Sequence, residues 1–161
     1  MSSRSSPDLP AAGSLALHLD LVGGLAGDMF VAALVDALPA LEAHVMTAVQ
    51  AVAPAGASVP SFTAAMQGGL AARRFGIATP YRHASERHGT SHAELVARIT
   101  AAPLAGDVRT HALAILALLA QAEADVHGIA LDAVHFHEIG DWDSLLDVVA
   151  ALHPEVIIID S

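Results

Sequence analysis

Cysteine and lysine are both absent from the 161 residues of this chain. Without cysteine there are no disulfides, thiolate metal ligands or cysteine nucleophiles, so a transition metal would have to bind nitrogen and oxygen donors. Without lysine there is no amine for a Schiff base and no Walker A phosphate loop. The sequence also has no G-x-S-x-G nucleophile elbow. The sequence therefore does not support a nucleophilic hydrolase, and metal-dependent chemistry is the class of function that is still possible.

Basic and aromatic residues are scarce. Seven arginines are set against 17 acidic residues, which gives a formal net charge of -10. A nucleic-acid surface needs clustered cations to neutralise phosphates, so no nucleic-acid partner is expected. Aromatic residues make up only 4% of the chain, whereas hydrophobic residues make up 54%. The core must therefore be built from small aliphatic side chains, which favours closely packed helices.

Long apolar runs are missing as well. No run approaches the roughly 20 residues of a membrane-spanning helix, and the Ala/Leu stretch 112–120 is bounded by His111 and Gln121. The segment Met1–Ser14 is rich in Ser, Pro and Gly, which is typical of a flexible leader rather than a signal peptide. We therefore expect one domain over residues 15–161, located in the cytoplasm and without membrane contact.

The spacing of apolar residues predicts helices that alternate with strands. Strands are expected over residues 15–22 and 156–159, and a hairpin over 61–67 and 70–81 that turns at Gly68 and Gly69. Helices are expected over residues 26–38, 41–52, 92–103, 107–126 and 141–152. Their predicted boundaries are a capping box at Ser91 and Glu94, N-caps at Asp107 and Asp141, and a stop at Gly128. The expected fold class is α/β, a single domain with a mixed sheet of about four strands packed with about five helices.

Ligand-type side chains gather between His127 and Asp147 in a chain that is otherwise aliphatic. In Val134-His135-Phe136-His137, an extended backbone would put both imidazoles on one face, about 7 Å apart at their Cα atoms. Glu138 follows directly, and Asp143 lies one helical turn before Asp147, so the set suits Ni, Zn, Mn or Mg, of which the softer ions fit imidazole best. The alternatives are an ordinary half-exposed strand for the histidines and a solvated helix face for the aspartates.

A second cluster is the segment Asp20-Leu21-Val22-Gly23-Gly24-Leu25-Ala26-Gly27-Asp28, in which a glycine turn joins two acidic positions. Glycines let the backbone approach an anion, and free N–H groups at a helix N-terminus favour phosphate. Beside a phosphate, Asp20 and Asp28 would hold a divalent ion more naturally than touch the phosphate itself. The alternative is structural, with Asp28 as a stabilising charge in the first helical turn and Asp20 bonded to the turn.

The polar segment 82–91 is expected to be an exposed loop. It brings His83, His88 and His92 close together around Gly89. Their spacing suits transient capture of a metal ion, and simple solvation is the alternative.

Taken together, these clusters resemble the pyridinium-3,5-bisthiocarboxylic acid mononucleotide nickel insertion family. The resemblance rests on Gly27-Asp28-Met29-Phe30 and, further along, on Ala122-Glu123-Ala124-Asp125-Val126-His127-Gly128, Val134-His135-Phe136-His137-Glu138-Ile139-Gly140 and Asp143-Ser144. Two motifs in the same order as in the family make the resemblance specific. The similarity extends from about Leu15 to Ser161. The family's histidine-rich loop falls at His83, His88 and His92, although this chain has no run of adjacent imidazoles there.

The resemblance implies a cyclometallase of the lyase class, which places nickel between two thiocarboxylate sulfurs and forms a carbon–nickel bond on the pyridinium ring. CTP would be hydrolysed, with Mg or Mn assisting. The product would be the nickel-pincer cofactor of lactate racemase, so apo lactate racemase or a related nickel-pincer enzyme is an expected partner. The family's C-terminal domain, to which CTP binding belongs, is absent from this chain, which would therefore act with that domain or a separate subunit. A homo-oligomer is left open.

The residues that match the family's motifs lead to a hypothesis for their individual roles. Glu138 and Asp143 would be catalytic, with Glu138 accepting the proton lost from the ring carbon. Cofactor binding would fall to Gly24, Gly27 and Asp28, metal binding to His127, His135, His137, Asp20, Asp28 and Asp143, and nickel capture to His83, His88 and His92. Two alternatives remain: a stand-alone nickel-binding module or metallochaperone without turnover, and a metal-dependent hydrolase built on His135, His137 and Asp143, which would hold zinc with an open water position.

Overall fold

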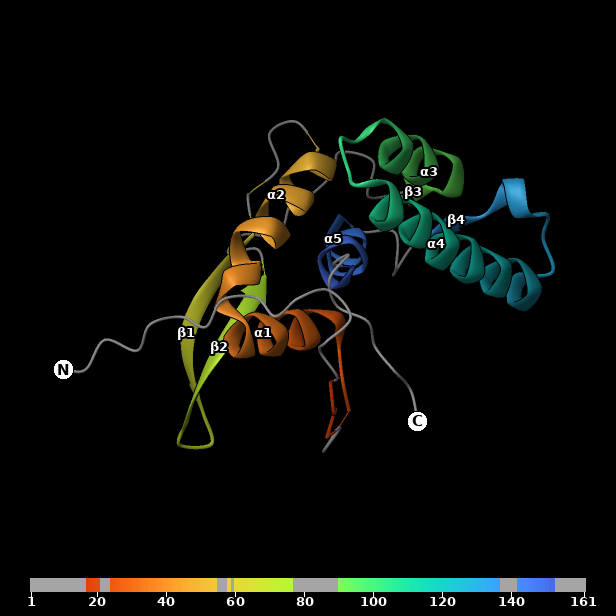
Figure 1. Ribbon diagram of the computed structural model, residues 1–161. Helices are drawn as coiled ribbons and strands as arrows, with labels where there is room; N and C mark the ends of the chain where they lie inside the picture. The colour runs from red at the N-terminus through yellow and green to blue at the C-terminus, as the bar shows by residue number, and fades with distance from the viewer. Residues whose placement is uncertain are drawn as a thin grey trace.

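The computed structural model describes residues 17–20, 24–54, 58, 60–76, 90–136 and 142–152. Within these ranges, five α-helices form a body from which one β-hairpin projects, as Figure 1 shows. The predicted combination of helices and strands in a single domain is confirmed. The four described strands, however, lie in two separate two-stranded antiparallel sheets, whereas a single mixed sheet was expected. The difference arises because a helix, and not a strand, occupies the centre of the body.

That central helix is α5 (Trp142–Ala151). It packs against α1 (Gly27–Ala37), α2 (Glu42–Val52) and α4 (Gly106–His127), and Figure 1 shows it surrounded by them. A 3₁₀ turn, Pro39–Leu41, joins α1 to α2. The buried residues of α5 are Leu145, Leu146, Val149 and Ala150. Because neighbours cover more than one side of α5, its apolar surface is wider than the single stripe of a surface helix.

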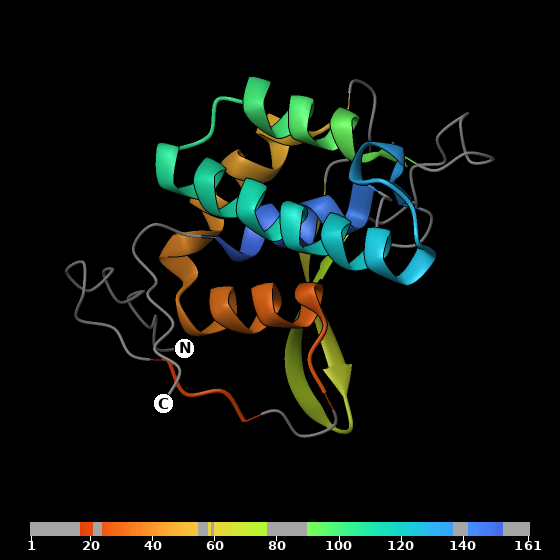
Figure 2. The ribbon, with the colours of Figure 1, turned by 90° about the vertical axis from the view of Figure 1, so that its right-hand side faces the viewer.

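The helices α3 (His92–Ala101) and α4 pack on each other across one side of the body, as Figure 2 shows. The predicted capping box of α3 is confirmed, since Ser91 Oγ accepts from Glu94 N at 3.2 Å and the Glu94 carboxylate accepts from Ser91 N at 2.9 Å. The predicted stop of α4 is also confirmed, because Gly128 has a φ of 63°, a left-handed conformation that favours glycine.

Two predictions about α4 are wrong. Its N-cap is Ala105, whereas Asp107 lies in the first turn and accepts a hydrogen bond from the adjacent Val108 N. The predicted apolar stripe included Ala122 and Val126, yet both are exposed, Val126 by 80%. The buried positions recur at every fourth residue: Val108, Ala112, Leu116, Ala120 and Ala124. This single i+4 ridge is narrow enough to pack closely, because three of its five members are alanine.

The hairpin pairs β1 (Ser61–Gln67) with β2 (Leu70–Gly76) in antiparallel register, with Phe62 opposite Phe75. The prediction of this hairpin is confirmed, and residues 77–81, which it also included, lie outside the described residues. Gly68 and Gly69 have φ angles of 56° and 81°, as a type I′ turn requires. In Figure 2 the hairpin extends beyond α1, so its tip is away from the core.

The second sheet joins β3 (Thr90–Ser91) to β4 (His135–Phe136). The strand predicted over 15–22 is not seen in its described part, since residues 17–20 have no regular secondary structure. The predicted strand 156–159, the leader 1–14 and the predicted N-cap Asp141 lie outside the described residues.

In the described ranges, no single helix has the length and apolar character to cross a membrane. The one pair of helices that meets those criteria jointly, Gly27–Ala37 with Pro39–Val52, is bent by 116°.

Candidate functional site

The first part of the candidate site is β4, which presents His135 on the surface. Val134 and Phe136 are each 1% exposed, while His135 between them is exposed. The predicted alternation is thus confirmed as far as Phe136, and His137 and Glu138 lie outside the described residues. The pairing that holds this strand is Thr90 with Phe136 and Ser91 with His135.

The imidazole of His135 is oriented by a local contact. Its Nδ1 lies 3.1 Å from the carbonyl oxygen of Ala133. A carbonyl oxygen can only accept a hydrogen bond, so in this contact Nδ1 carries the proton, and in a neutral imidazole Nε2 then has the lone pair. Histidine ligands of metals commonly have this arrangement, in which one ring nitrogen donates to a carbonyl and the other binds the ion.

The sequence did not single out Glu94 as a residue of this site, and the fold places it there. The pairing of Ser91 with His135 brings the start of α3 next to β4. The backbone N–H and hydroxyl of Ser91 donate to the Glu94 carboxylate and lower the pKa of Glu94, and His135 when protonated and Arg98 lower it further. Glu94 is therefore a fixed, ionised carboxylate beside an imidazole. The capping-box pattern revealed its local role, but only the tertiary pairing reveals its neighbour.

His92 also adjoins β4. It is the first residue of α3, where the predicted helix over 92–103 was expected to begin, because the capping box starts the helix there. Its backbone N donates to Val134 O at 3.1 Å, and its ring lies edge-on to Phe136 with 6.4 Å between centroids. The other two histidines assigned to metal capture, His83 and His88, lie outside the described residues.

A groove of about 840 Å³ runs along α3 beside His92. Its lining is His92, Ala93, Val96, Ala97, Thr100, Ala101, Leu131 and Asp132. None of the described residues of this lining is an arginine, the side chain best suited to bind a phosphate group in a bidentate manner.

His127, another predicted ligand, ends α4. Its Nε2 lies 3.2 Å from Glu123 Oε2, one helical turn earlier, and its side chain is 62% exposed. This contact occupies one ring nitrogen, and a metal ion would have to displace it or bind Nδ1. Throughout the described residues, no three His, Asp or Glu side chains gather closely enough to hold a metal ion.

The glycine turn forms the second part of the site. Gly24 has a φ of 101°, which a side chain would strain, and Asp20 is exposed. Asp28 is in the first turn of α1, where its Oδ1 accepts from Met29 N at 2.9 Å. This contact fits the structural alternative for Asp28, in which a carboxylate stabilises the helix N-terminus. A role for Asp28 in binding a ligand stays a prediction.

The glycine turn contacts α5 at Gly27. A Cβ atom on Gly27 would lie 2.6 Å from the Cβ and 2.8 Å from the Oδ2 of Asp147, so α1 and α5 touch here with no room for a side chain. Asp147 is half-buried, so the solvated helix face considered for Asp143 and Asp147 does not apply to Asp147. Asp143 lies one turn earlier in α5, and its side chain is not among those described. The glycine turn and the acidic helix, distant in sequence, are therefore adjacent in space.

The comparisons with known proteins agree on one family. The family model described as nickel insertion protein matches residues 17–154. The chain is 39% identical over 135 residues to the pyridinium-3,5-bisthiocarboxylic acid mononucleotide nickel insertion protein of Nocardioides sp. and covers 33% of that protein with 83% of its own length. It is 34% identical over 151 residues to the protein of the same name from Akkermansia muciniphila, with 91% of this chain and 37% of that protein covered.

The chain thus spans about a third of the length of the curated relatives it matches. No solved structure matches it. The family match covers both the glycine turn and β4 with its histidine, the two regions on which the resemblance was based. This chain belongs to the nickel insertion protein family.

Proposed function

We propose that this chain binds nickel and delivers it to pyridinium-3,5-bisthiocarboxylic acid mononucleotide. The observation that carries the proposal is the state of His135: an exposed imidazole on a buried strand, with Nδ1 donating to a carbonyl and Nε2 left for a ligand. The names of the relatives support the same substrate. Nickel is the cargo of this reaction, and His135, His137 and His127 are its proposed ligands.

The neighbourhood of His135 suits transfer better than permanent storage. The described donors are few and exposed, so a nickel ion held there would keep open coordination positions for the thiocarboxylate sulfurs of the acceptor. Glu94 adds a negative charge beside the imidazole, which raises the affinity for a divalent cation. We propose that nickel is captured by His83, His88 and His92. The supporting observation is that Thr90, two residues after His88, pairs with Phe136, which directly precedes His137.

The chemistry of insertion is also a proposal. As the carbon–nickel bond forms, the ring carbon loses a proton, and Glu138, directly after His137, is the proposed acceptor, with Asp143 as a second carboxylate. Gly24, Gly27 and Asp28 are proposed to contact the mononucleotide. We further propose that the whole reaction consumes CTP with another part of the enzyme and yields the nickel-pincer cofactor of lactate racemase. The described carboxylates do not surround a site for the Mg or Mn ion of CTP, because Asp20 is exposed and Asp28 accepts a hydrogen bond from Met29 N. No step is therefore assigned to that ion.

Nickel binding by the 161-residue chain tests the proposal directly. Titration calorimetry would compare the unchanged chain with the double variant His135→Ala/His137→Ala, with zinc and manganese as competitors. The matched control is His111→Ala, which removes an exposed imidazole from α4. The double variant should weaken nickel binding at least about tenfold and the control should not. Equal affinities in all three proteins would place the nickel site elsewhere.

The variant Glu94→Gln tests the neighbouring carboxylate. Glutamine retains the capping box, because its side-chain oxygen still accepts from Ser91 N, but it removes the negative charge. Nickel affinity should fall by about tenfold with no loss of helix, as circular dichroism would show. Unchanged affinity would mean that Glu94 only caps α3.

A second experiment distinguishes the cyclometallase from the metallochaperone alternative. The nickel-loaded chain would be mixed with the pyridinium precursor and a CTP-binding domain from a relative, with and without CTP. Nickel insertion that requires CTP supports the enzyme. Transfer that proceeds equally without CTP supports the metallochaperone.

A further inference from the structure

Within the described residues, the outer edge of β1 is an unpaired strand edge. In Figure 1, β1 lies on the outside of the molecule, and β2 lies between it and α1. Among the described elements, β1 has extensive contacts with β2. The helix α1 also has extensive contacts with β2. The outward N–H and C=O groups of β1 therefore have no strand partner in this part of the chain, and such an edge readily pairs with another strand.

The sequence of β1 lacks the usual protection of a free edge. Ser61-Phe62-Thr63-Ala64-Ala65-Met66-Gln67 contains no charge, proline or glycine, and it pairs with β2 without a bulge. Natural edge strands are commonly blocked by lysine, proline or a bulge. In a chain with a net charge of -10, an uncharged seven-residue edge is a surface on which self-repulsion between two copies is weak.

We propose that β1 pairs antiparallel with β1 of a second copy of this chain, about a two-fold axis at Ala64. The two hairpins then form one four-stranded sheet. Phe62 lies opposite the second copy's Met66, and Thr63 opposite the second copy's Ala65. This register pairs odd positions with odd and even with even, so the outward backbone groups of one copy meet those of the other, and on the order of six to eight hydrogen bonds form.

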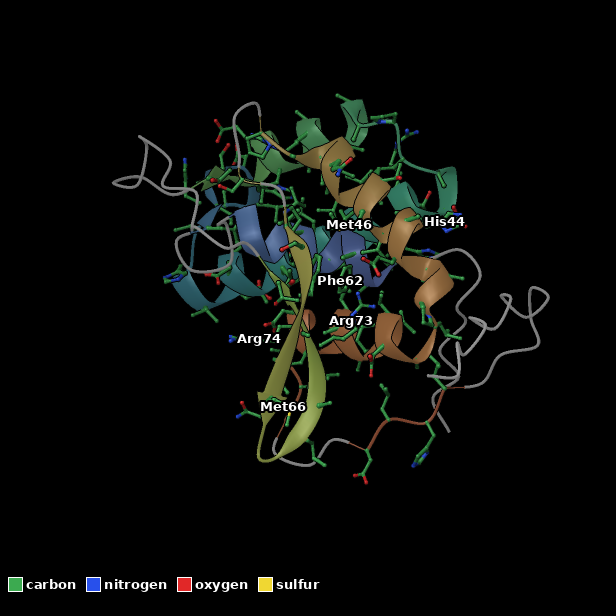
Figure 3. The ribbon with its side chains drawn as sticks, turned by 90° about the vertical axis from the view of Figure 1, so that its left-hand side faces the viewer. His44, Met46, Phe62, Met66, Arg73 and Arg74 are labelled. Carbon is green, nitrogen blue, oxygen red and sulfur yellow. The ribbon has the colours of Figure 1, made fainter. Side chains whose placement is uncertain are left out.

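The side chains of β1 fit a second copy of the same strand. Phe62 is held in place by Phe75, with 4.9 Å between ring centroids, and by the guanidinium of Arg73 at 5.0 Å. Met66 is 68% exposed, and Figure 3 shows it near the hairpin tip. Each copy therefore offers a fixed ring and a flexible thioether, which meet twice across the axis. Ala64, exposed and small, can lie against its own counterpart.

The charges near the edge do not oppose this pairing. Arg73 forms an ion pair with Glu42 of α2 at 2.8 Å. Figure 3 shows Arg73 turned toward the helices and Arg74 on the opposite side of the hairpin. Both belong to β2, one strand away from the new contact. Because each copy has one such β1 edge, the pairing closes at two copies and does not continue into a filament.

The test is a charge exchange at the axis, measured by analytical ultracentrifugation of the 161-residue chain at physiological salt. The unchanged chain should dimerise with increasing concentration. Ala64→Lys and Ala64→Glu should each weaken the dimer at least about tenfold, because two like charges then face each other. An equimolar mixture of the two variants should restore a dimer, since the charges become opposite.

Ala117→Lys is the control, because Ala117 is an exposed alanine on α4, away from the hairpin in Figure 1. It should dimerise like the unchanged chain. Circular dichroism and thermal unfolding would confirm that all variants fold. A monomer at all concentrations would overturn the proposal, and so would a dimer that neither variant at Ala64 weakens or a mixture that fails to restore it.

Discussion

The contact between Gly27 and Asp147 makes the substitution Gly27→Ala an informative perturbation. Gly27 is the first residue of α1, and its φ angle is not left-handed. Alanine would therefore ordinarily be tolerated there and would stabilise the helix by about 1 kcal/mol at most. The new Cβ, however, would lie 2.6 Å from the Cβ of Asp147, an atom close to the backbone of α5 that cannot rotate away. The two helices would have to separate.

Overpacking of this kind costs about 1–3 kcal/mol. After the gain in helix propensity is subtracted, Gly27→Ala should lower the free energy of unfolding by about 1–2 kcal/mol. For a chain of this size the melting temperature should fall by roughly 2–8 °C. Urea and thermal unfolding followed by circular dichroism would measure both quantities.

The control is Gly106→Ala, which changes the first residue of α4. A Cβ there would meet nothing within 4 Å, and the φ of Gly106 is not left-handed. This variant should be neutral or more stable than the unchanged chain. If Gly27→Ala proved as stable as Gly106→Ala, the reasoning about the α1–α5 contact would be refuted.

The remaining predictions concern α3 and α4. Ser91→Ala removes the cap of α3 and should cost about 1 kcal/mol, measured by urea unfolding. The pKa of Glu94 is lower in the folded chain than in the unfolded chain. The contribution of Glu94 to stability is therefore present above the unfolded pKa and is lost as the pH falls through the folded pKa. Glu94→Gln should accordingly flatten the acid limb of a stability–pH profile. Leu116→Ala should cost about 2–5 kcal/mol because Leu116 is buried, whereas Leu118→Ala, at a position 73% exposed, should change little; similar losses for both would contradict the position of the α4 ridge.

Local patterns were sufficient for many of the elements. The box formed by Ser91 and Glu94, the stop at Gly128 and the turn at Gly68 and Gly69 depend on hydrogen bonds or φ angles within a few residues, and each was found where the sequence indicated it. The apolar stripe of α4 was less predictable, because alanine is compatible with both buried and exposed positions. In a helix as rich in alanine as this one, the packing of α3 and α5 decides which side is buried.

The candidate site divides in the same way. Alternation along β4 was enough to expose His135 and bury Phe136, since neighbouring side chains of a strand point to opposite faces. The proximity of Glu94 to His135 could not be predicted, because it depends on which strand pairs with β4. The expected single sheet was wrong for a similar reason: strand patterns show that strands exist but do not name their partners.

The amino-acid sequence by itself determined the family, the helices and hairpin, and the residue types available for nickel, because each of these depends on the order and spacing of residues that are close in the sequence. The tertiary structure alone decided that Gly27 meets Asp147 and that Glu94 adjoins His135. The physical reason is that contacts between segments distant along the chain arise from the packing of whole elements around α5, and that packing depends on the combined shape of their buried faces and not on any one motif.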